Sequence, residues 1–177
     1  MDSQINLQKL IDQKDIKIAV KRIASEIRKD FKGKNPLFIG VLKGGFVFLS
    51  DLIREFDFNV EIEFIRLSSY GKKTETSGKI IEVLGLNSEI KNRNVIVVED
   101  IVDTGYTTSF LLNWLKNKNP LSLKFCALTN KPSRRKVSII INYLGFTIPD
   151  KFIVGYGIDF NEKYRNLPDI YFIEFKD

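Results

Sequence analysis

The chain has 177 residues, of which 44% are hydrophobic and 28% are charged, and these values are typical of one soluble globular domain. The lack of histidine excludes His-based metal sites and both Ser-His-Asp and Cys-His catalysis, so any chemistry must use carboxylates, lysines, hydroxyls or a bound ion. The net charge of +6 slightly favours an anionic partner, and the single cysteine excludes an internal disulfide.

The first part of the chain alternates between helix and strand patterns. Its opening residues, MDSQINLQKL, have neither the pattern of a signal peptide nor that of a transit peptide, and no apolar run reaches the roughly 20 residues of a membrane span. Apolar residues at helical spacing predict a helix over 16–31, which ends at the run KGKNP. The continuous apolar run 37–42 predicts a doubly buried strand. We expect a cytoplasmic protein with no membrane partner.

Residues 44–56 predict a second helix, with one face formed by Phe46, Leu49, Leu52, Ile53 and Phe56. Residues 60–69 begin with the alternation of a strand. The polar, glycine-flanked segment 70–78 has no apolar anchor and predicts a mobile surface loop.

The remaining segments are mostly strand-like. Residues 107–117 carry apolar side chains at helical spacing, and the other apolar runs predict strands at 79–86, 94–100, 123–129, 137–145, 152–157 and 170–175. Cys126 lies in one of these runs, where a buried, inert thiol is expected in a reducing compartment. Alternating strands and helices predict an α/β domain with a mostly parallel sheet. Ligands of such sheets bind beyond the carboxyl ends of the strands, where VLKGGF and VVEDIVDTGYTT should share one rim.

The stretch VVEDIVDTGYTT combines an acidic half with an anion-binding half. Glu99 and Asp100 stand at the exit of a buried strand, where carboxylates need partners, and they should point to opposite faces. Residues 103–108 form a glycine turn at a helix start, which is suited to an anion. The plainer interpretation is that Asp103 or Thr107 caps the helix and the two acids are solvated. A sugar phosphate, with a bridging Mg²⁺, would satisfy both halves.

VVEDIVDTG resembles the signature of the type I phosphoribosyltransferases, which bind 5-phosphoribosyl-1-pyrophosphate (PRPP). The blocks VLKGGFVF, SSYG, NKPSRR and GFTIPDKFIVGYGIDFNEKYRNLP resemble the purine salvage branch, and they occur in that family's order across roughly residues 36 to 170. The resemblance implies a single domain over 1–177, with helices flanking the sheet and a small hood built from the chain termini. It also implies transfer of the phosphoribosyl group to hypoxanthine or guanine, Mg²⁺ as cofactor, and a homodimer or homotetramer that binds no nucleic acid.

The resemblance also assigns roles along the PRPP molecule. Glu99 and Asp100 would hold the ribose hydroxyls and metal, and carboxylates are strong acceptors for paired hydroxyls. Lys43 and Gly44 would offer backbone N–H groups to pyrophosphate, with a cis peptide between Leu42 and Lys43, and Arg165 would be a second pyrophosphate ligand. The 5′-phosphate would lie on Asp103, Thr104, Gly105, Tyr106, Thr107 and Thr108, where Tyr106 replaces a lysine that the family often has.

The remaining roles concern the base and the reaction. Lys131 would donate to the 6-oxo group, Phe152 would stack on the purine and Ile153 would contact its edge through backbone groups. Asp159 would help hold a second Mg²⁺ through water. Ser69 and Tyr70 would begin a loop that closes over the reacting centre, and Asp103 would act as general base at purine N7.

Each role has a plainer alternative in the residue taken alone. Lys43, Lys131 and Arg165 could be solvated surface cations, whereas Phe152 and Ile153 could be strand core. Two other functions also stay open: a phosphoribosyltransferase that prefers xanthine, and a non-catalytic, nucleotide-sensing RNA-binding regulator on the same fold. A P-loop kinase is disfavoured, since no G-x-x-x-x-G-K-[ST] motif occurs.

Overall fold

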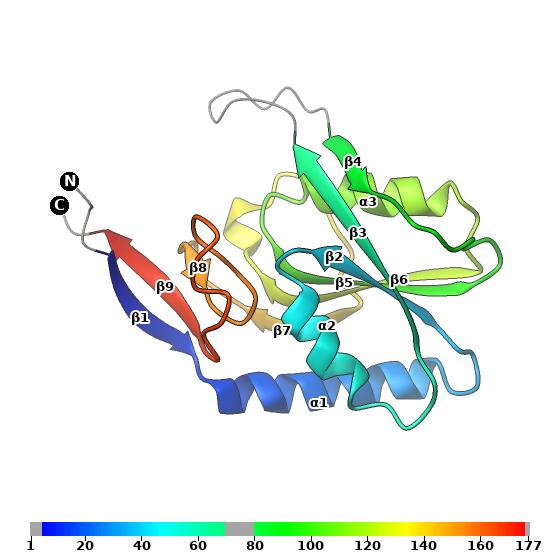
Figure 1. Cartoon of the computed structure of the whole chain (residues 1–177), viewed down its shortest axis with the longest axis horizontal. Helices are drawn as coiled ribbons and strands as arrows, with labels where there is room; N and C mark the ends of the chain where they lie inside the picture. Colours follow the sequence, from blue (N-terminus) through cyan, green and yellow to red (C-terminus); the bar gives the residue numbers. More distant parts are fainter. Residues whose placement is uncertain (1–4, 70–79, 176–177) are drawn as a thin grey trace.

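A six-stranded sheet forms the centre of the computed structural model, which describes residues 5–69 and 80–175 (Figure 1). The strand order is β4-β3-β2-β5-β6-β7, and every neighbouring pair is parallel except β3 and β4. The strands are β2 (Leu37–Leu42), β3 (Glu61–Ser69), β4 (Ile80–Leu84), β5 (Asn94–Val102), β6 (Ser122–Asn130) and β7 (Tyr143–Thr147). The prediction of a mostly parallel α/β sheet is confirmed.

The order of the strands reverses between β2 and β5. From β2 the chain passes through helix α2 (Phe46–Ile53) to β3 on one side, and from β5 it passes through helix α3 (Tyr106–Lys116) to β6 on the other. In an open parallel sheet, such a reversal leaves a crevice beyond the carboxyl ends of the two strands. Both glycine-containing junctions begin at this crevice, as the sequence predicted.

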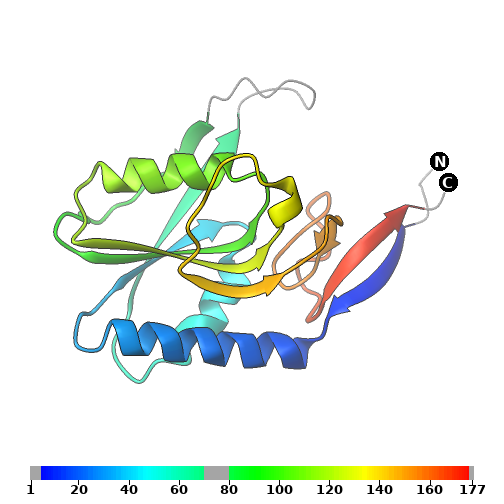
Figure 2. The same ribbon diagram turned by 180° about the vertical axis from the view of Figure 1, so that it is seen from behind.

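The two faces of the sheet are covered by different helices (Figures 1 and 2). Helix α1 (Gln13–Asp30) and α2 pack in one core cluster with Ile96 and Val98 of β5, whereas α3 packs in the other with Val95 and Val97. Asp12 caps α1, because its side chain accepts a hydrogen bond from the backbone N–H of Lys14. The alternation along β5 places Glu99 on the α3 face and Asp100 on the α2 face.

A second, antiparallel sheet stands at one end of the molecule and joins distant parts of the chain. Its order is β1-β9-β8, formed by β1 (Ile5–Ile11), β9 (Ile170–Phe175) and β8 (Ile153–Val154) (Figure 1). This sheet is the predicted hood from the chain termini. Strand β1 was not predicted, because INLQKLI mixes apolar and polar residues without a strict period of two.

Three expectations about the elements need correction. The strand predicted over 137–145 begins only at Tyr143. Three consecutive isoleucines precede it in an irregular segment, where Ile139 and Ile141 pack against the α3 core and Ile140 is exposed. Helix α2 ends at Ile53 rather than at residue 56, and its first residue Phe46 is exposed while Phe48 is buried.

Two further expectations concern Cys126 and the predicted mobile loop. Cys126 is fully buried, and burial raises the pKa of its thiol, as expected for an inert residue. The predicted loop at 70–78 lies outside the described residues. Among the residues that the structure describes, no helix is long and apolar enough to cross a membrane.

Candidate active site

The turn after β2 lies directly against the end of β5. The peptide bond between Leu42 and Lys43 is cis, as the resemblance implied. A methyl group added at Gly44 would overlap the Asp100 carboxylate, so the backbone of this turn touches Asp100 with no room for a side chain. A methyl group at Gly157 would overlap the carbonyl of Gly44. The sheet therefore brings the β2 turn, Asp100 and the tail segment around Gly157 into one place.

Glu99 is buried and Asp100 is partly buried, and neither has an ion pair among the described side chains. Glu99 is 8% exposed, and its carboxylate accepts a hydrogen bond from the Thr108 hydroxyl at 2.9 Å. Burial, with a smaller effect of Asp100, raises the pKa of Glu99 to about 8. Burial also raises the pKa of Asp100 to about 6, against hydrogen bonds from its own N–H and that of Ile101. The solvated interpretation of these acids is wrong for Glu99.

The turn from β5 into α3 has the form of an anion-binding loop. Gly105 caps the helix with φ of +89°, and no side chain caps the free N–H groups. The alternative that Asp103 or Thr107 caps this helix is therefore wrong. Because the helix start carries a partial positive charge, these N–H groups are suited to an anion. Thr107 is exposed at this end, whereas the Thr108 hydroxyl is buried against Glu99.

The segment after β6 supports the same turn from behind. The Arg135 guanidinium donates to the carbonyl of Asp103 at 3.1 Å and to that of Val102 at 3.2 Å, and it also bonds the Asn130 side chain. The backbone N–H of Lys136 donates to the Thr104 carbonyl at 2.9 Å. The sequence analysis missed this support, because it gave Arg135 no role of its own within the block NKPSRR.

The Asp103 carboxylate lies among cations. Arg134 contacts its Oδ1 at 2.9 Å and reaches Asp150 at 3.7 Å. Lys131 is only 6% exposed, so its interpretation as a surface cation is wrong. Burial lowers the pKa of the Lys131 ammonium, while the nearby carboxylates of Asp103 and Asp150 oppose that shift. The turn thus places an acid and a buried amine at the same rim.

Phe152 and Ile153, at the start of β8, offer respectively an exposed aromatic ring and backbone groups that do not bond to β9. Phe152 is 48% exposed and stacks edge-on against Phe160, so it is not strand core. Ile153 is 2% exposed, and its side chain does belong to the core. The N–H of Ile173 donates to the Phe152 carbonyl at 2.9 Å, which makes Ile153 and Phe172 a non-hydrogen-bonded pair. The N–H and C=O of Ile153 therefore point away from β9.

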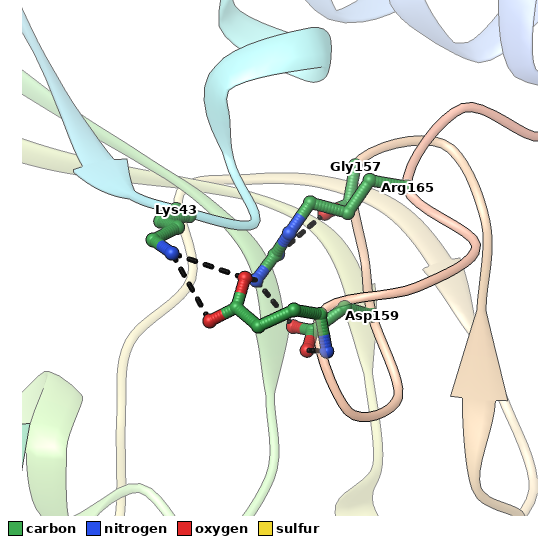
Figure 3. Close-up of polar contacts among 5 residues, drawn as sticks. Lys43, Gly157, Asp159 and Arg165 are labelled. Atoms are coloured by element: carbon green, nitrogen blue, oxygen red, sulfur yellow. Dashed lines mark hydrogen bonds and ion pairs between the residues drawn. The ribbon is translucent and has the colours of Figure 1, made fainter.

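A charged cluster joins the β2 turn to the chain's tail (Figure 3). The Arg165 guanidinium lies 2.7 Å from Asp159 Oδ1 and donates to the Gly157 carbonyl at 2.9 Å. The Glu162 carboxylate accepts from Lys43 at 3.0 Å and from Arg165 at 3.0 Å. Lys43 and Arg165 are therefore paired rather than merely solvated. Glu162 was missed in the sequence, since no local pattern distinguishes it from other surface acids.

Ser69 and Tyr70 were predicted to begin the loop that closes over the reacting centre. Ser69 ends β3 at the same rim of the sheet, and Tyr70 lies outside the described residues.

The acids at the rim suit a hard cation that takes some of its ligands from the protein and the others from a substrate. Within residues 5–69 and 80–175, no group of three or more acidic, cysteine or histidine side chains forms a preassembled metal site. Mg²⁺ typically uses one or two carboxylates and completes its shell with water and phosphate oxygens. Glu99 and Asp100 have pKa values that desolvation raises, and they are the kind of ligands whose charge such a cation would neutralise.

Replacement of Glu99 by glutamine is expected to stabilise the ligand-free protein at alkaline pH. The folded protein holds the Glu99 proton to about pH 8, whereas the unfolded chain releases it near the ordinary pKa of 4.5. The stability contribution of Glu99 therefore falls as pH rises from 4.5 to about 8. We expect Glu99→Gln to raise Tm at pH 8 by about 3–6 °C, and the gain to vanish near pH 5.

The matched control is Glu89→Gln, which neutralises an exposed glutamate. Its Tm should follow that of the unmodified protein at both pH values. A gain for Glu99→Gln that is equal at pH 5 and pH 8 would contradict the raised pKa. Thermal unfolding followed by circular dichroism measures all three proteins.

The sequence of the chain is similar to those of known proteins. Residues 7–161 match the model of the phosphoribosyl transferase domain. The chain is 44% identical over 169 residues to the hypoxanthine-guanine phosphoribosyltransferase of Aquifex aeolicus, covering 95% of both chains. It is 40% identical to that of Bacillus subtilis, covering 91% of this chain and 89% of the relative.

A solved structure agrees with these relatives. The crystal structure of a hypoxanthine-guanine phosphoribosyltransferase from Bacillus anthracis superposes with a TM-score of 0.90 at 47% identity, and the match covers 97% of this chain and 99% of the other. The fold, the acid pair at the end of β5 and the anion-binding turn have the same explanation: the chain belongs to the hypoxanthine-guanine branch of the phosphoribosyltransferase family.

Proposed function

We propose that the chain transfers the 5-phosphoribosyl group of PRPP to hypoxanthine or guanine, giving IMP or GMP and pyrophosphate. The observation that carries this proposal is the position of the acid pair formed by the buried Glu99 and the partly buried Asp100. One acid adjoins the anion-binding turn through Thr108, and the other adjoins the Gly44 turn. A substrate with a diol between a phosphate and a diphosphate would use the acid pair, the anion-binding turn and the Gly44 turn together.

Different residues would bind the ribose, its 5′-phosphate and its pyrophosphate group. Glu99 and Asp100 accept hydrogen bonds from the ribose hydroxyls and ligate the metal, with Asp159 contributing through water. Residues 103–107 bind the 5′-phosphate through backbone N–H groups and the exposed Thr107 hydroxyl. These groups do not require the lysine that Tyr106 replaces. Lys43, Gly44 and Arg165 bind pyrophosphate.

The purine would lie between Phe152 and Lys131. Phe152 is half-exposed and offers its ring face, while Ile153 offers the backbone N–H and C=O that point away from β9. Lys131 donates to the 6-oxo group of hypoxanthine or guanine. The 6-amino group of adenine would leave the buried ammonium facing another donor, which excludes adenine.

The reaction exchanges one bond of the ribose for another. The bond from ribose C1′ to the pyrophosphate oxygen breaks with its electron pair leaving on pyrophosphate, and the bond from C1′ to the purine nitrogen forms. Mg²⁺, when bound, neutralises the charge that grows on the leaving group. Asp103 accepts the proton from N7, and Arg134 on Oδ1 orients this carboxylate. Ser69 and Tyr70 lead into the loop that would exclude water. The active form is a homodimer or homotetramer in the cytoplasm.

Pyrophosphate release tests the proposed function. With PRPP, Mg²⁺ and one purine at a time, we expect release with hypoxanthine and guanine, and none when Mg²⁺ is chelated. The value of kcat/KM for adenine should be lower by at least about 100-fold. A preference for xanthine would instead support the alternative enzyme. Salt-dependent RNA binding with no pyrophosphate release would support the regulator and overturn the proposal.

The variant Lys131→Met tests whether Lys131 determines which purine the protein accepts. It keeps the length of the side chain and removes the charged donor, so kcat/KM for hypoxanthine should fall by about 10- to 100-fold while the low value for adenine changes little. Lys136→Met is the matched control, because Lys136 is an exposed lysine of the same segment. Equal losses in the two variants would remove the specific role of Lys131.

A further inference from the structure

Glu162 accepts hydrogen bonds from two cations that come from distant parts of the chain, Lys43 and Arg165, both of which are labelled in Figure 3. Both of its carboxylate oxygens are 3.0 Å from Lys43 Nζ, and Oε2 is also 3.0 Å from the Arg165 guanidinium. These two cations are the ones that the proposed function assigns to pyrophosphate. A carboxylate resembles a phosphate group in its charge and in the geometry of its acceptor oxygens. In the ligand-free protein, Glu162 thus makes the contacts that a diphosphate oxygen would make.

The backbone around Glu162 also sets it apart. Phe160 and Lys163 exchange two backbone hydrogen bonds, of 3.2 and 3.0 Å, and enclose Asn161 and Glu162 in a tight hairpin turn. Both enclosed residues have positive φ, 51° for Asn161 and 61° for Glu162. Such turns favour asparagine first and glycine second. Asn161 follows this preference, whereas a glutamate at the glycine position is strained. Such strain is tolerated where the residue has a functional role.

We propose that Glu162 is a built-in counter-ion of the pyrophosphate subsite, which competes with the diphosphate of substrate and product for Lys43 and Arg165. The inference rests on the proposed function, because that function makes this place a diphosphate site. The carboxylate moves aside when diphosphate enters and returns to the two cations when pyrophosphate leaves. Glu162 thereby weakens diphosphate binding and favours release of the product.

The competition has a limited strength and depends on salt. Glu162 is 65% exposed and Lys43 is 43% exposed, so water screens their attraction. Arg165 is only 19% exposed and keeps Asp159 as a second partner at 2.7 Å, so it stays in position when Glu162 leaves. The effect should therefore be modest at physiological ionic strength and should shrink further as salt is added.

Pyrophosphate binding to the full-length protein tests the inference without turnover. Titration calorimetry with Mg²⁺ and pyrophosphate is expected to give a Kd that is about 3- to 10-fold lower for Glu162→Gln than for the unmodified protein. Product inhibition by pyrophosphate should tighten by a similar factor. If Glu162 instead holds Lys43 and Arg165 in a binding geometry, its removal raises the Kd. The sign of the change therefore distinguishes competition from a structural role.

Two further variants separate charge from backbone strain. Glu162→Gly removes the carboxylate and relieves the positive φ, and it should lower the Kd as much as Glu162→Gln does. Glu26→Gln removes an exposed glutamate that pairs with Arg22 at 2.7 Å on α1, and its Kd should be unchanged. Equal binding by Glu162→Gln and the unmodified protein would overturn the counter-ion role alone. Absence of both pyrophosphate binding and turnover in the unmodified protein would overturn the proposed function itself.

Discussion

Asp103→Asn is expected to lower kcat for phosphoribosyl transfer by about 10²- to 10⁴-fold, the usual contribution of a positioned general base. Asparagine keeps the size of the side chain and can still contact Arg134, but it cannot accept a proton from the purine. The Kd for each substrate should therefore stay within about threefold, since the loss arises in the transition state. Steady-state kinetics with hypoxanthine, together with calorimetry of PRPP binding, separates the two quantities.

The matched control is Asp150→Asn. Asp150 is the other carboxylate that reaches Arg134, at 3.7 Å, and it is half-exposed. If Asp103 acted only by balancing the charge of Arg134, the two variants would lose similar activity. A kcat for Asp103→Asn within threefold of the unmodified value would remove Asp103 from the role of base. The base would then have to be another carboxylate of this rim, because the sequence has no histidine.

The sequence predicted the sheet well because its central strands are buried on both faces. The run 37–42 and the run 95–98 are continuously apolar, and a chain can bury such runs only between two layers of helix. The same apolar background made Glu99 and Asp100 conspicuous, since carboxylates at the end of a buried strand need partners. These two acids could therefore be assigned to a site before their contacts were known.

The sequence failed where tertiary packing rather than local pattern decides the structure. Residues 137–142 contain three consecutive isoleucines, as a strand often does, yet Ile139 and Ile141 face the α3 core from an irregular segment. Phe46 fits a helical face, yet it lies at the exposed start of α2. In both segments the spacing of apolar residues was identified correctly, but the spacing does not say which neighbouring element will cover them.

The pairing of Glu162 was beyond sequence reasoning for a different reason. Its partner Lys43 is 119 residues away, and the two meet only because the tail returns to the turn after β2. Long-range pairs of exposed charges leave no periodic signal. By contrast, Lys131 and Arg165 were identified by resemblance alone, and the burial of Lys131 now gives its assignment independent physical support.

Gly44→Ala is expected to lower kcat/KM for PRPP by about 100-fold or more, because displaced catalytic groups carry costs of that size. The backbone of Gly44 lies against the Asp100 carboxylate, and the added methyl group would overlap it. Either the turn or Asp100 must move. The first shift would displace the proposed pyrophosphate ligands and the second would displace a proposed ribose and metal ligand. Steady-state kinetics with PRPP as the varied substrate measures this loss.

A double-mutant cycle identifies the overlap as the cause. Overpacking should make Gly44→Ala cost about 1–3 kcal/mol of stability in the unmodified protein. In an Asp100→Ala background the methyl group has room, so the same change should cost less than about 0.5 kcal/mol. Gly33→Ala supplies the contrast, since it has open space but φ of +72°, and it should lose stability without loss of activity. Equal costs of Gly44→Ala in both backgrounds would show that Asp100 does not set the requirement for glycine.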